Sequence, residues 1–201
     1  YGISTKSIDY AASKEINLII ALDCGIQAID KVEYAKEKNI DLIICDHHRP
    51  SKEIPKAIAV LNPLREDCQY PYKELCGCGI GFKLIQAMSS RMGQTIESIK
   101  KHLDLVALAI VADIVSLTGE NRILCYYGLE QINQSPRPGL KAIIDTLDKD
   151  NITINELGFY IGPRINAAGR MESGNIAVEL LIEKNLDKAS GLAEKLNQLN
   201  I

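Results

Sequence analysis

The sequence predicts an α/β fold in which a parallel β-sheet with flanking helices is followed by a mostly helical half. Three apolar runs have the length of strands: Asn17–Leu22, Asp41–Cys45 and Ala57–Leu61. Runs of this kind are typical of strands buried on both faces of a parallel sheet. The segment Ile26–Lys38 carries apolar residues at helical spacing between charged ones. Strands that alternate with helices predict a parallel sheet, because parallel strands need crossover connections.

Helical spacing dominates from residue 76 onward. The Cys76–Gly81 segment is expected to open a helix. A long helix is expected over Ile96–Leu117, and its second half, apolar all round, is expected to be buried. Further helices are predicted at 121–133, 140–147, 154–160 and 175–183, and a charged amphipathic helix at 187–199.

Composition excludes several classes of protein. The 201 residues are 46% hydrophobic and 24% charged, which suits a globular domain and excludes a disordered, collagen-like or coiled-coil chain. The longest nearly apolar run, Leu105–Leu117, is too short to cross a bilayer. The net charge of −3 gives no global basic field, so any contact with nucleic acid must be local. The start at Tyr1, without an initiator Met or a leader, suggests an excised fragment.

The six cysteines favour a reduced, cytoplasmic protein over a disulfide framework. Cys24 and Cys45 end apolar strand-like runs, and Cys125 lies in an apolar-rich helix. Only Cys76 and Cys78 are close together, as C-x-C. A zinc site formed by this pair and a histidine is an alternative, although no second cysteine pair stands at ligand spacing.

Ligand-type side chains follow two of the predicted strands. Asp23 ends the first, and Asp46-His47-His48 ends the second. Ligands bind at the carboxyl ends of parallel strands, where neighbouring strands lie about 5 Å apart. Asp23 alone could be a helix N-cap, and Asp46-His47-His48 alone could be a solvated turn. Together they favour a metal site.

Asp113 is a third candidate, because apolar residues surround it in the sequence and an unpaired buried carboxylate needs a cation or donors. A structural salt bridge or a helix cap is the alternative. Asp104 follows Lys100 and Lys101 and is expected at the surface. Aspartates with a histidine suit Mg²⁺ or Mn²⁺, and such sites predict phosphoester hydrolysis.

A second polar cluster spans residues 161–170. Arg164, Asn166 and Arg170 stand among glycines and alanines that let a backbone approach a ligand, and guanidinium groups suit phosphate. The alternative is a Gly/Pro loop with solvated arginines. The scarcity of aromatic residues gives no sign of base stacking.

Five segments of the chain resemble the motifs of the DHH phosphoesterase superfamily and follow one another in the same order. Of these, Gly77–Lys83 and Gly162–Arg170 are similar to the RecJ-type branch, which digests single-stranded DNA from 5′ to 3′. The resemblance covers nearly the whole chain and implies a phosphodiesterase that uses two Mn²⁺ or Mg²⁺ ions in recombination and repair. The segments are Leu22–Gly25, Asp46–Pro50, Gly77–Lys83, Val111–Val115 and Gly162–Arg170.

Motif matching also implies roles for single residues. Asp23 would bridge the two metals, His47 and Asp113 would complete one metal site, and Asp46 would orient these ligands from behind. His48 would face the phosphate. The substrate path would be lined by Arg164, Asn166 and Arg170.

The resemblance implies that the chain is only part of such an enzyme. Residues 1–185 would form the phosphoesterase core, without the family's aspartate-rich first motif, and residues 186–201 would begin a linker helix to an absent domain. The isolated chain is therefore expected to bind metal weakly and to show little activity. Partners implied are single-stranded DNA, a helicase and a single-strand-binding protein, with no membrane. Alternatives are a hydrolase of small phosphodiesters or pyrophosphate, and an inactive DHH scaffold.

Overall fold

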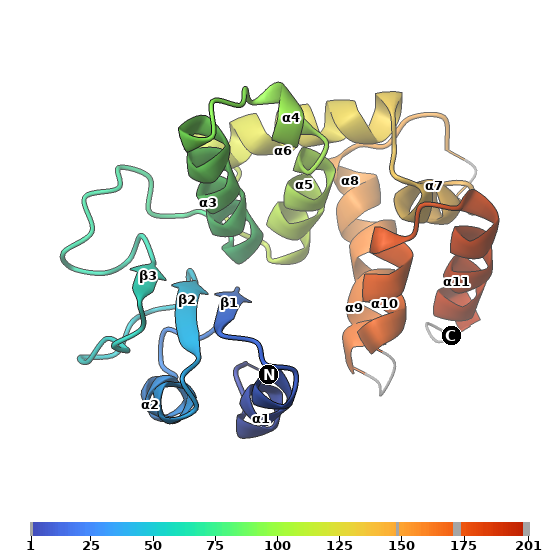
Figure 1. Cartoon of the computed structure of the whole chain (residues 1–201). Helices are drawn as coiled ribbons and strands as arrows, with labels where there is room; N and C mark the ends of the chain where they lie inside the picture. The colour runs from blue at the N-terminus through green and yellow to red at the C-terminus, as the bar shows by residue number, and fades with distance from the viewer. Residues whose placement is uncertain (1, 148, 171–173, 199–201) are drawn as a thin grey trace. The chain divides into compact units, whose positions relative to one another are not determined.

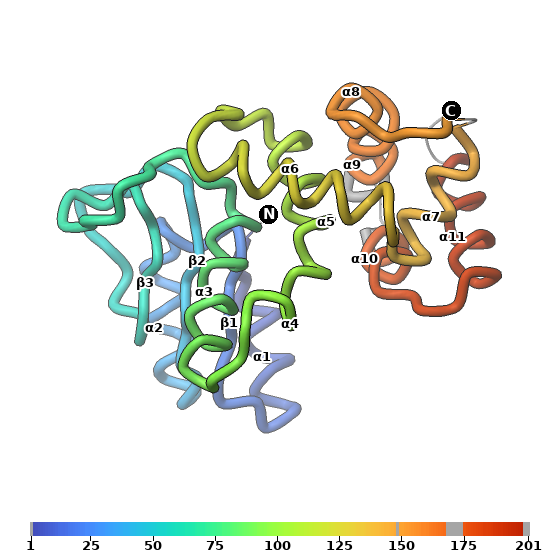
Figure 2. The backbone as a smooth tube through the Cα atoms, turned by 90° about the horizontal axis from the view of Figure 1, so that it is seen from above, coloured from blue at the N-terminus to red at the C-terminus, as the bar shows by residue number. Residues whose placement is uncertain are grey.

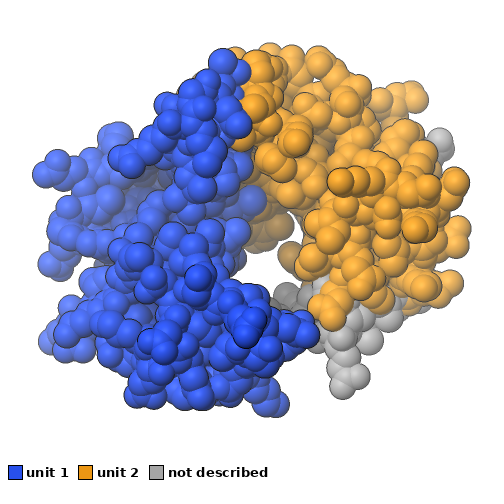
Figure 3. Space-filling model, viewed as in Figure 1, with its two compact units in different colours: residues 1–96, 118–121 blue, residues 97–117, 122–201 orange. Residues whose placement is uncertain are grey.

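The computed structural model describes residues 2–147, 149–170 and 174–198. The chain folds into two compact units (Figure 3). Unit 1 comprises residues 1–96 and 118–121, and unit 2 comprises residues 97–117 and 122–201. Each unit has its own buried side chains, such as Leu42 and Ile44 in unit 1 and Leu157 and Leu180 in unit 2.

Unit 1 contains a parallel sheet of three strands in the order β1-β2-β3 (Figure 1). The strands are β1 (Leu18–Leu22), β2 (Asp41–Cys45) and β3 (Ala59–Leu61). Leu22 is in register with Cys45, and Cys45 with Leu61. The predicted α/β class and parallel sheet are confirmed, and the carboxyl ends of all three strands meet at one edge.

The strands differ in burial. Leu42, Ile44 and Cys45 of β2 are buried, as expected for the central strand. The expectation that the first strand is buried on both faces was wrong for the described residues, because Leu18, Ile20 and Leu22 are exposed. Leu18, Ile20 and Leu22 are alternate residues and point to the same face, so one face of β1 is exposed while the other carries buried Ala21.

Three helices flank the sheet in unit 1. They are α1 (Thr5–Ser13), α2 (Ile29–Glu37) and α3 (Gly77–Arg91). Ile8 and Ala11 of α1 pack in one cluster with Ala35 of α2 and with Leu42 of β2. The helix α1 was not predicted, although Ser4 and Ser7 form a capping box at its start, which is a sequence signal for a helix N-terminus.

All regular secondary structure in the described residues of unit 2 is helical (Figure 2). The predicted long helix over 96–117 is instead two helices, and the second stops at Ala112 because Ile114 takes a left-handed conformation, with φ of 53°. The other predicted helices are present. The elements are α4 (Glu97–Lys100), α5 (Leu103–Ala112), α6 (Gly119–Gln134), α7 (Pro138–Ile144), α8 (Ile154–Glu156), the π-helical turn η1 (Leu157–Ile161), α9 (Gly162–Arg170), α10 (Gly174–Ile182) and α11 (Leu186–Gln198).

A buried ion pair joins three helices of unit 2. Asp104 is 1% exposed, so its predicted surface position was wrong. Its carboxylate accepts hydrogen bonds from Nε and Nη2 of Arg137, at 2.6 and 2.7 Å. Arg137 also donates to the Leu181 carbonyl. The partner lies 33 residues away, so the neighbouring lysines in the sequence gave a misleading indication of exposure.

The last described helix, α11, packs against α7 and α9 of unit 2. The predicted boundary at residues 185–186 stays a prediction. Among the helices of the described residues, none is both long enough and apolar enough to cross a bilayer.

Candidate metal centre

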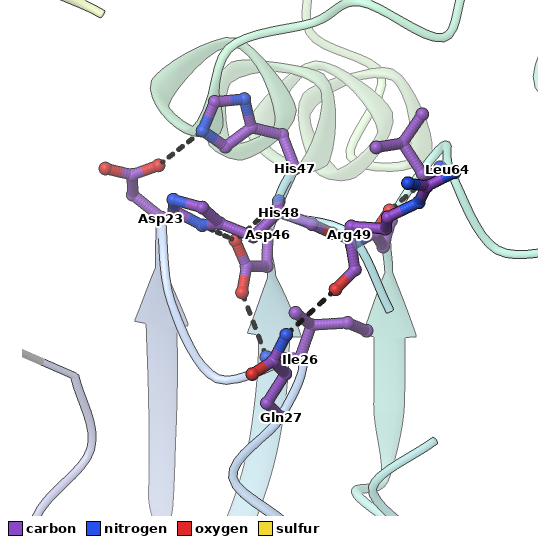
Figure 4. Close-up of polar contacts among 9 residues, drawn as sticks. Asp23, Ile26, Gln27, Asp46, His47, His48, Arg49 and Leu64 are labelled. Atoms are coloured by element: carbon purple, nitrogen blue, oxygen red, sulfur yellow. Dashed lines mark hydrogen bonds and ion pairs between the residues drawn. The ribbon is translucent and has the colours of Figure 1, made fainter. Parts of the chain in front are cut away.

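The candidate centre lies at the carboxyl end of the sheet in unit 1 (Figure 4). Asp23 directly follows β1, and its amide donates to the Cys45 carbonyl at 2.8 Å. Asp46, His47 and His48 directly follow β2. The pairing of β1 with β2 therefore brings both predicted ligand groups to one place.

Asp23 is held in an unusual position. Its φ is 64°, a left-handed conformation that aspartate tolerates better than most residues. Gly77, the first residue of α3, lies against it so closely that a Cβ there would be 2.1 Å from the Asp23 Oδ1 atom. The helix start and the ligand loop are thus packed with no room for a side chain between them.

His47 faces the Asp23 carboxylate. Its Nε2 atom lies 3.2 Å from Asp23 Oδ1, and the His47 side chain is 14% exposed whereas that of Asp23 is 56% exposed. The carboxylate therefore lies between the largely buried imidazole and solvent. Two cis ligands of an octahedral ion at 2.0–2.1 Å stand about 3 Å apart, so this separation suits two ligands of one cation.

Asp46 lies behind the ligands and holds the His48 ring. It is 1% exposed, its Oδ2 accepts from the Ile26 amide at 2.9 Å, and its Oδ1 contacts His48 Nδ1 at 2.7 Å. Burial by itself would raise the pKa of Asp46, but the hydrogen bonds from the Ile26 amide and from the ring and amide of His48 outweigh it and hold that pKa below its usual value. Asp46 stays ionised. Because its carboxylate contacts His48 through Nδ1, the Nε2 atom of His48 can bind a metal ion or a phosphate.

One metal-type cluster occurs within the described residues, formed by Asp23, His47 and His48. One ligand atom of each lies within 4.8 Å of the others. A carboxylate with two imidazoles is a mixed donor set, which fits Mn²⁺ better than Mg²⁺ because Mg²⁺ prefers oxygen ligands alone. The cluster contains no cysteine; Cys76 instead caps α3, its Sγ accepting from the Gly79 amide.

A cleft of about 430 Å³ opens beside the cluster. Its wall includes Asp23, Asp46 and His48, together with Gln27 and Lys31 from the region where α2 begins. Gln27 Nε2 donates to the Arg49 carbonyl, which ties this wall to the loop after β2. The helix α2 begins three residues later than predicted, because Ala28 takes a non-helical conformation, with φ of −87° and ψ of 51°.

Asp113 belongs to unit 2, whereas the cluster belongs to unit 1. It follows the last residue of α5 and is exposed. The expectation that Asp113 is buried was wrong, because α5 ends at Ala112 and the chain turns outward at Ile114. Its role as a metal ligand stays a prediction.

The 161–170 segment is helical, so the loop alternative was wrong. Arg164 is partly buried; its Nε donates to Asn197 Oδ1 at 2.8 Å and its Nη1 to the Tyr160 carbonyl. Asn166 is exposed. Arg170 ends α9, and its side chain lies outside the described part of the structure.

The sequence analysis did not identify Gly77 as part of the site, although it singled out the glycine-rich segment at the start of this helix.

The fold and this cluster define a candidate metal centre at the carboxyl edge of a parallel α/β sheet. Residues 3–110 match the model of the DHH family, N-terminal domain, and the chain belongs to the DHH family.

Within that family, the chain is similar to RecJ proteins. It is 37% identical to the single-stranded-DNA-specific exonuclease RecJ of Escherichia coli (strain K12), over all of this chain and 37% of the relative. A structure of exonuclease RecJ bound to manganese has a TM-score of 0.89 at 30% identity, covering 100% of this chain and 50% of that one. RecJ of Thermus thermophilus in complex with Mn²⁺ has a TM-score of 0.86 at 30% identity, covering 98% of this chain and 30% of that one. The chain thus spans just over a third of the length of its Escherichia coli relative.

Proposed function

We propose that this chain forms the metal-binding core of an exonuclease that hydrolyses single-stranded DNA from the 5′ end. The observation that carries the proposal is the Asp23–His47–His48 cluster backed by buried Asp46. Support comes from the similarity of the whole chain to proteins named single-stranded-DNA-specific exonucleases. Repair or recombination in the cytoplasm, with a helicase or a single-strand-binding protein as partner, belongs to the same proposal.

The proposed cofactor is Mn²⁺ or Mg²⁺, with two ions in the complete enzyme. Asp23 would hold both ions, and His47 and Asp113 would complete one site. When bound, the ions supply a hydroxide nucleophile and neutralise charge on the phosphoryl group.

The other site residues would orient the ligands or contact the substrate. Asp46 fixes the His48 ring through Nδ1, and we propose that His48 faces the phosphate with Nε2. Arg164, Asn166 and Arg170 would line the path of the strand. Because Arg164 already bonds Asn197 and the Tyr160 carbonyl, it would also hold the helix that presents the other two.

The test is a substrate panel for the complete protein. Single-stranded DNA with a 5′ phosphate should be degraded with Mn²⁺ and spared with EDTA, and duplex DNA, dinucleotides and pyrophosphate should be poor substrates. Asp113→Asn should abolish turnover, and Asp150→Asn serves as an exposed control. Preferred cleavage of dinucleotides or pyrophosphate would replace the proposal with a small-substrate hydrolase. Absence of turnover on every substrate would favour a scaffold.

A further inference from the structure

The chain has two phenylalanines with opposite environments. Phe82 is 3% exposed in unit 1, whereas Phe159 is 75% exposed in unit 2. Tyr160, the next residue, is 46% exposed. Both aromatic rings stand on η1, and π-helical turns of this kind are rare and frequently occur at functional sites. Two adjacent exposed rings on such a turn indicate a contact surface.

The turn packs against α5. A Cβ at Gly158 would lie 3.0 Å from Val111 Cγ1, so this position has no room for a side chain, and Gly162, which begins α9, lies in ordinary contact with Ala112. Val111 and Ala112 directly precede Asp113. The two aromatic residues therefore belong to the same corner of unit 2 as the proposed metal ligand.

The backbone of the turn is anchored from both sides. Arg164 donates to the Tyr160 carbonyl at 2.6 Å and to Asn197 of α11. Leu157 and Ile161, on the inner face, are fully buried. The exposed rings thus stand on a rigid support, which lowers the entropy lost when they bind a ligand.

We propose that Phe159, with Tyr160 beside it, stacks against a base of the single-stranded DNA substrate. The inference rests on the proposed function. An exonuclease without sequence preference must hold bases through a feature that all bases share, and their flat faces are such a feature. This chain's net charge of −3 provides little attraction for phosphates, so stacking would supply a non-ionic share of the affinity.

The test combines substitutions with abasic DNA. Phe159→Ala and Phe159→Leu in the complete protein should weaken single-stranded DNA binding about 5- to 150-fold, the range of one lost stack, without changing the salt slope. Phe159→Trp should retain binding. Tyr126→Ala, another exposed aromatic residue of unit 2, is the matched control and should have no effect.

An oligonucleotide with one abasic position, moved step by step along the strand, identifies the stacked base. At that position the unaltered protein should lose affinity, and Phe159→Ala should cause no further loss. Equal effects of Phe159→Ala on intact and all abasic strands would overturn the inference while leaving the proposed function in place. A large drop in Tm of Phe159→Ala without DNA would also overturn it, because the ring would then pack against protein. If the unaltered protein neither binds nor cleaves single-stranded DNA, the proposed function fails, and this inference fails with it.

Discussion

Replacing Gly77 by alanine tests whether the start of α3 positions the metal ligand. The new Cβ would lie 2.1 Å from Asp23 Oδ1 and 2.6 Å from Asp23 Cγ. Real Cβ atoms essentially never come within 3.0 Å of another heavy atom, so the carboxylate oxygen must move by about 1 Å. Metal–ligand distances tolerate about 0.2 Å, so this movement removes Asp23 from its place in the centre.

The substitution should weaken folding as well as metal binding. The new Cβ would also lie 2.6 Å from the Asp23 Cβ, which side-chain rotation cannot move, so the backbone must shift and we expect a stability loss of about 1–3 kcal/mol. Mn²⁺ affinity should fall about 10- to 100-fold, as for losses of supporting contacts around metal ligands. Calorimetric titration of Mn²⁺ into the complete protein measures the affinity, and thermal unfolding measures the stability.

Gly79→Ala is the matched control, because it makes the same change two residues further along α3. The atoms nearest to its Cβ would be Cys76 Sγ at 3.3 Å and Leu75 side-chain atoms at 3.6 and 3.9 Å. We expect Mn²⁺ affinity within about twofold of the unaltered protein, since no candidate ligand is displaced. Unchanged Mn²⁺ affinity in Gly77→Ala would refute the argument that this close contact sets the Asp23 position.

Three further predictions address the centre and the two cores. His47→Ala should abolish Mn²⁺-dependent hydrolysis in a nuclease assay with a modest fall in Tm, because the side chain is 14% exposed but lies on a loop after β2. Asp104→Ala should cost about 3–5 kcal/mol in a denaturant titration, because it leaves the Arg137 guanidinium without its buried partner. Burial would raise the pKa of Glu120, but hydrogen bonds from Lys83 and Tyr70 outweigh it and lower that pKa. Its contribution to stability should therefore be complete above about pH 4.3 and be lost as pH falls through the lower folded-state value, which acid unfolding of Glu120→Gln would reveal.

Each of these three predictions would be contradicted by a specific outcome. Normal turnover by His47→Ala would remove that residue from the centre. A loss below about 1 kcal/mol for Asp104→Ala would show that water replaces the ion pair. Identical acid unfolding of Glu120→Gln and the unaltered protein would show that this carboxylate has the same pKa in both states.

The sheet and the ligand cluster were predictable because they are formed by strands that follow one another along the chain. Consecutive strands of a β-α-β unit are neighbours in most sheets, and the observed pairing of β1 with β2 brings Asp23 together with the residues after Cys45. The steric fit at Gly77 could not be predicted, because it depends on how α3 approaches the strand end rather than on residue type.

Two acidic residues, Asp104 in α5 and Asp113 directly after it, show where sequence reasoning fails. Asp113 stands among apolar residues and is exposed, whereas Asp104 follows two lysines and is buried. Burial of a charge is decided by whether a partner reaches it in space, and Arg137 comes from another part of the chain. Polarity in the neighbouring sequence contains no information about such a partner.

The glycines around the GPRINAAGR segment (Gly162–Arg170) illustrate how one observation can support two structures. Small residues were interpreted as letting a backbone approach a ligand, with a loop as the alternative. In the structure, Gly158 lets the turn η1 approach Val111 of α5, and Gly162 packs closely against the Leu157 carbonyl. Under the proposal that Phe159 stacks on a base, the ligand contact moves from the backbone of this segment to the side chains on the outer face of η1. A buried inner face of Leu157 and Ile161 and an exposed outer face with Phe159 then serve one requirement, which is to hold the stacking ring rigidly on unit 2.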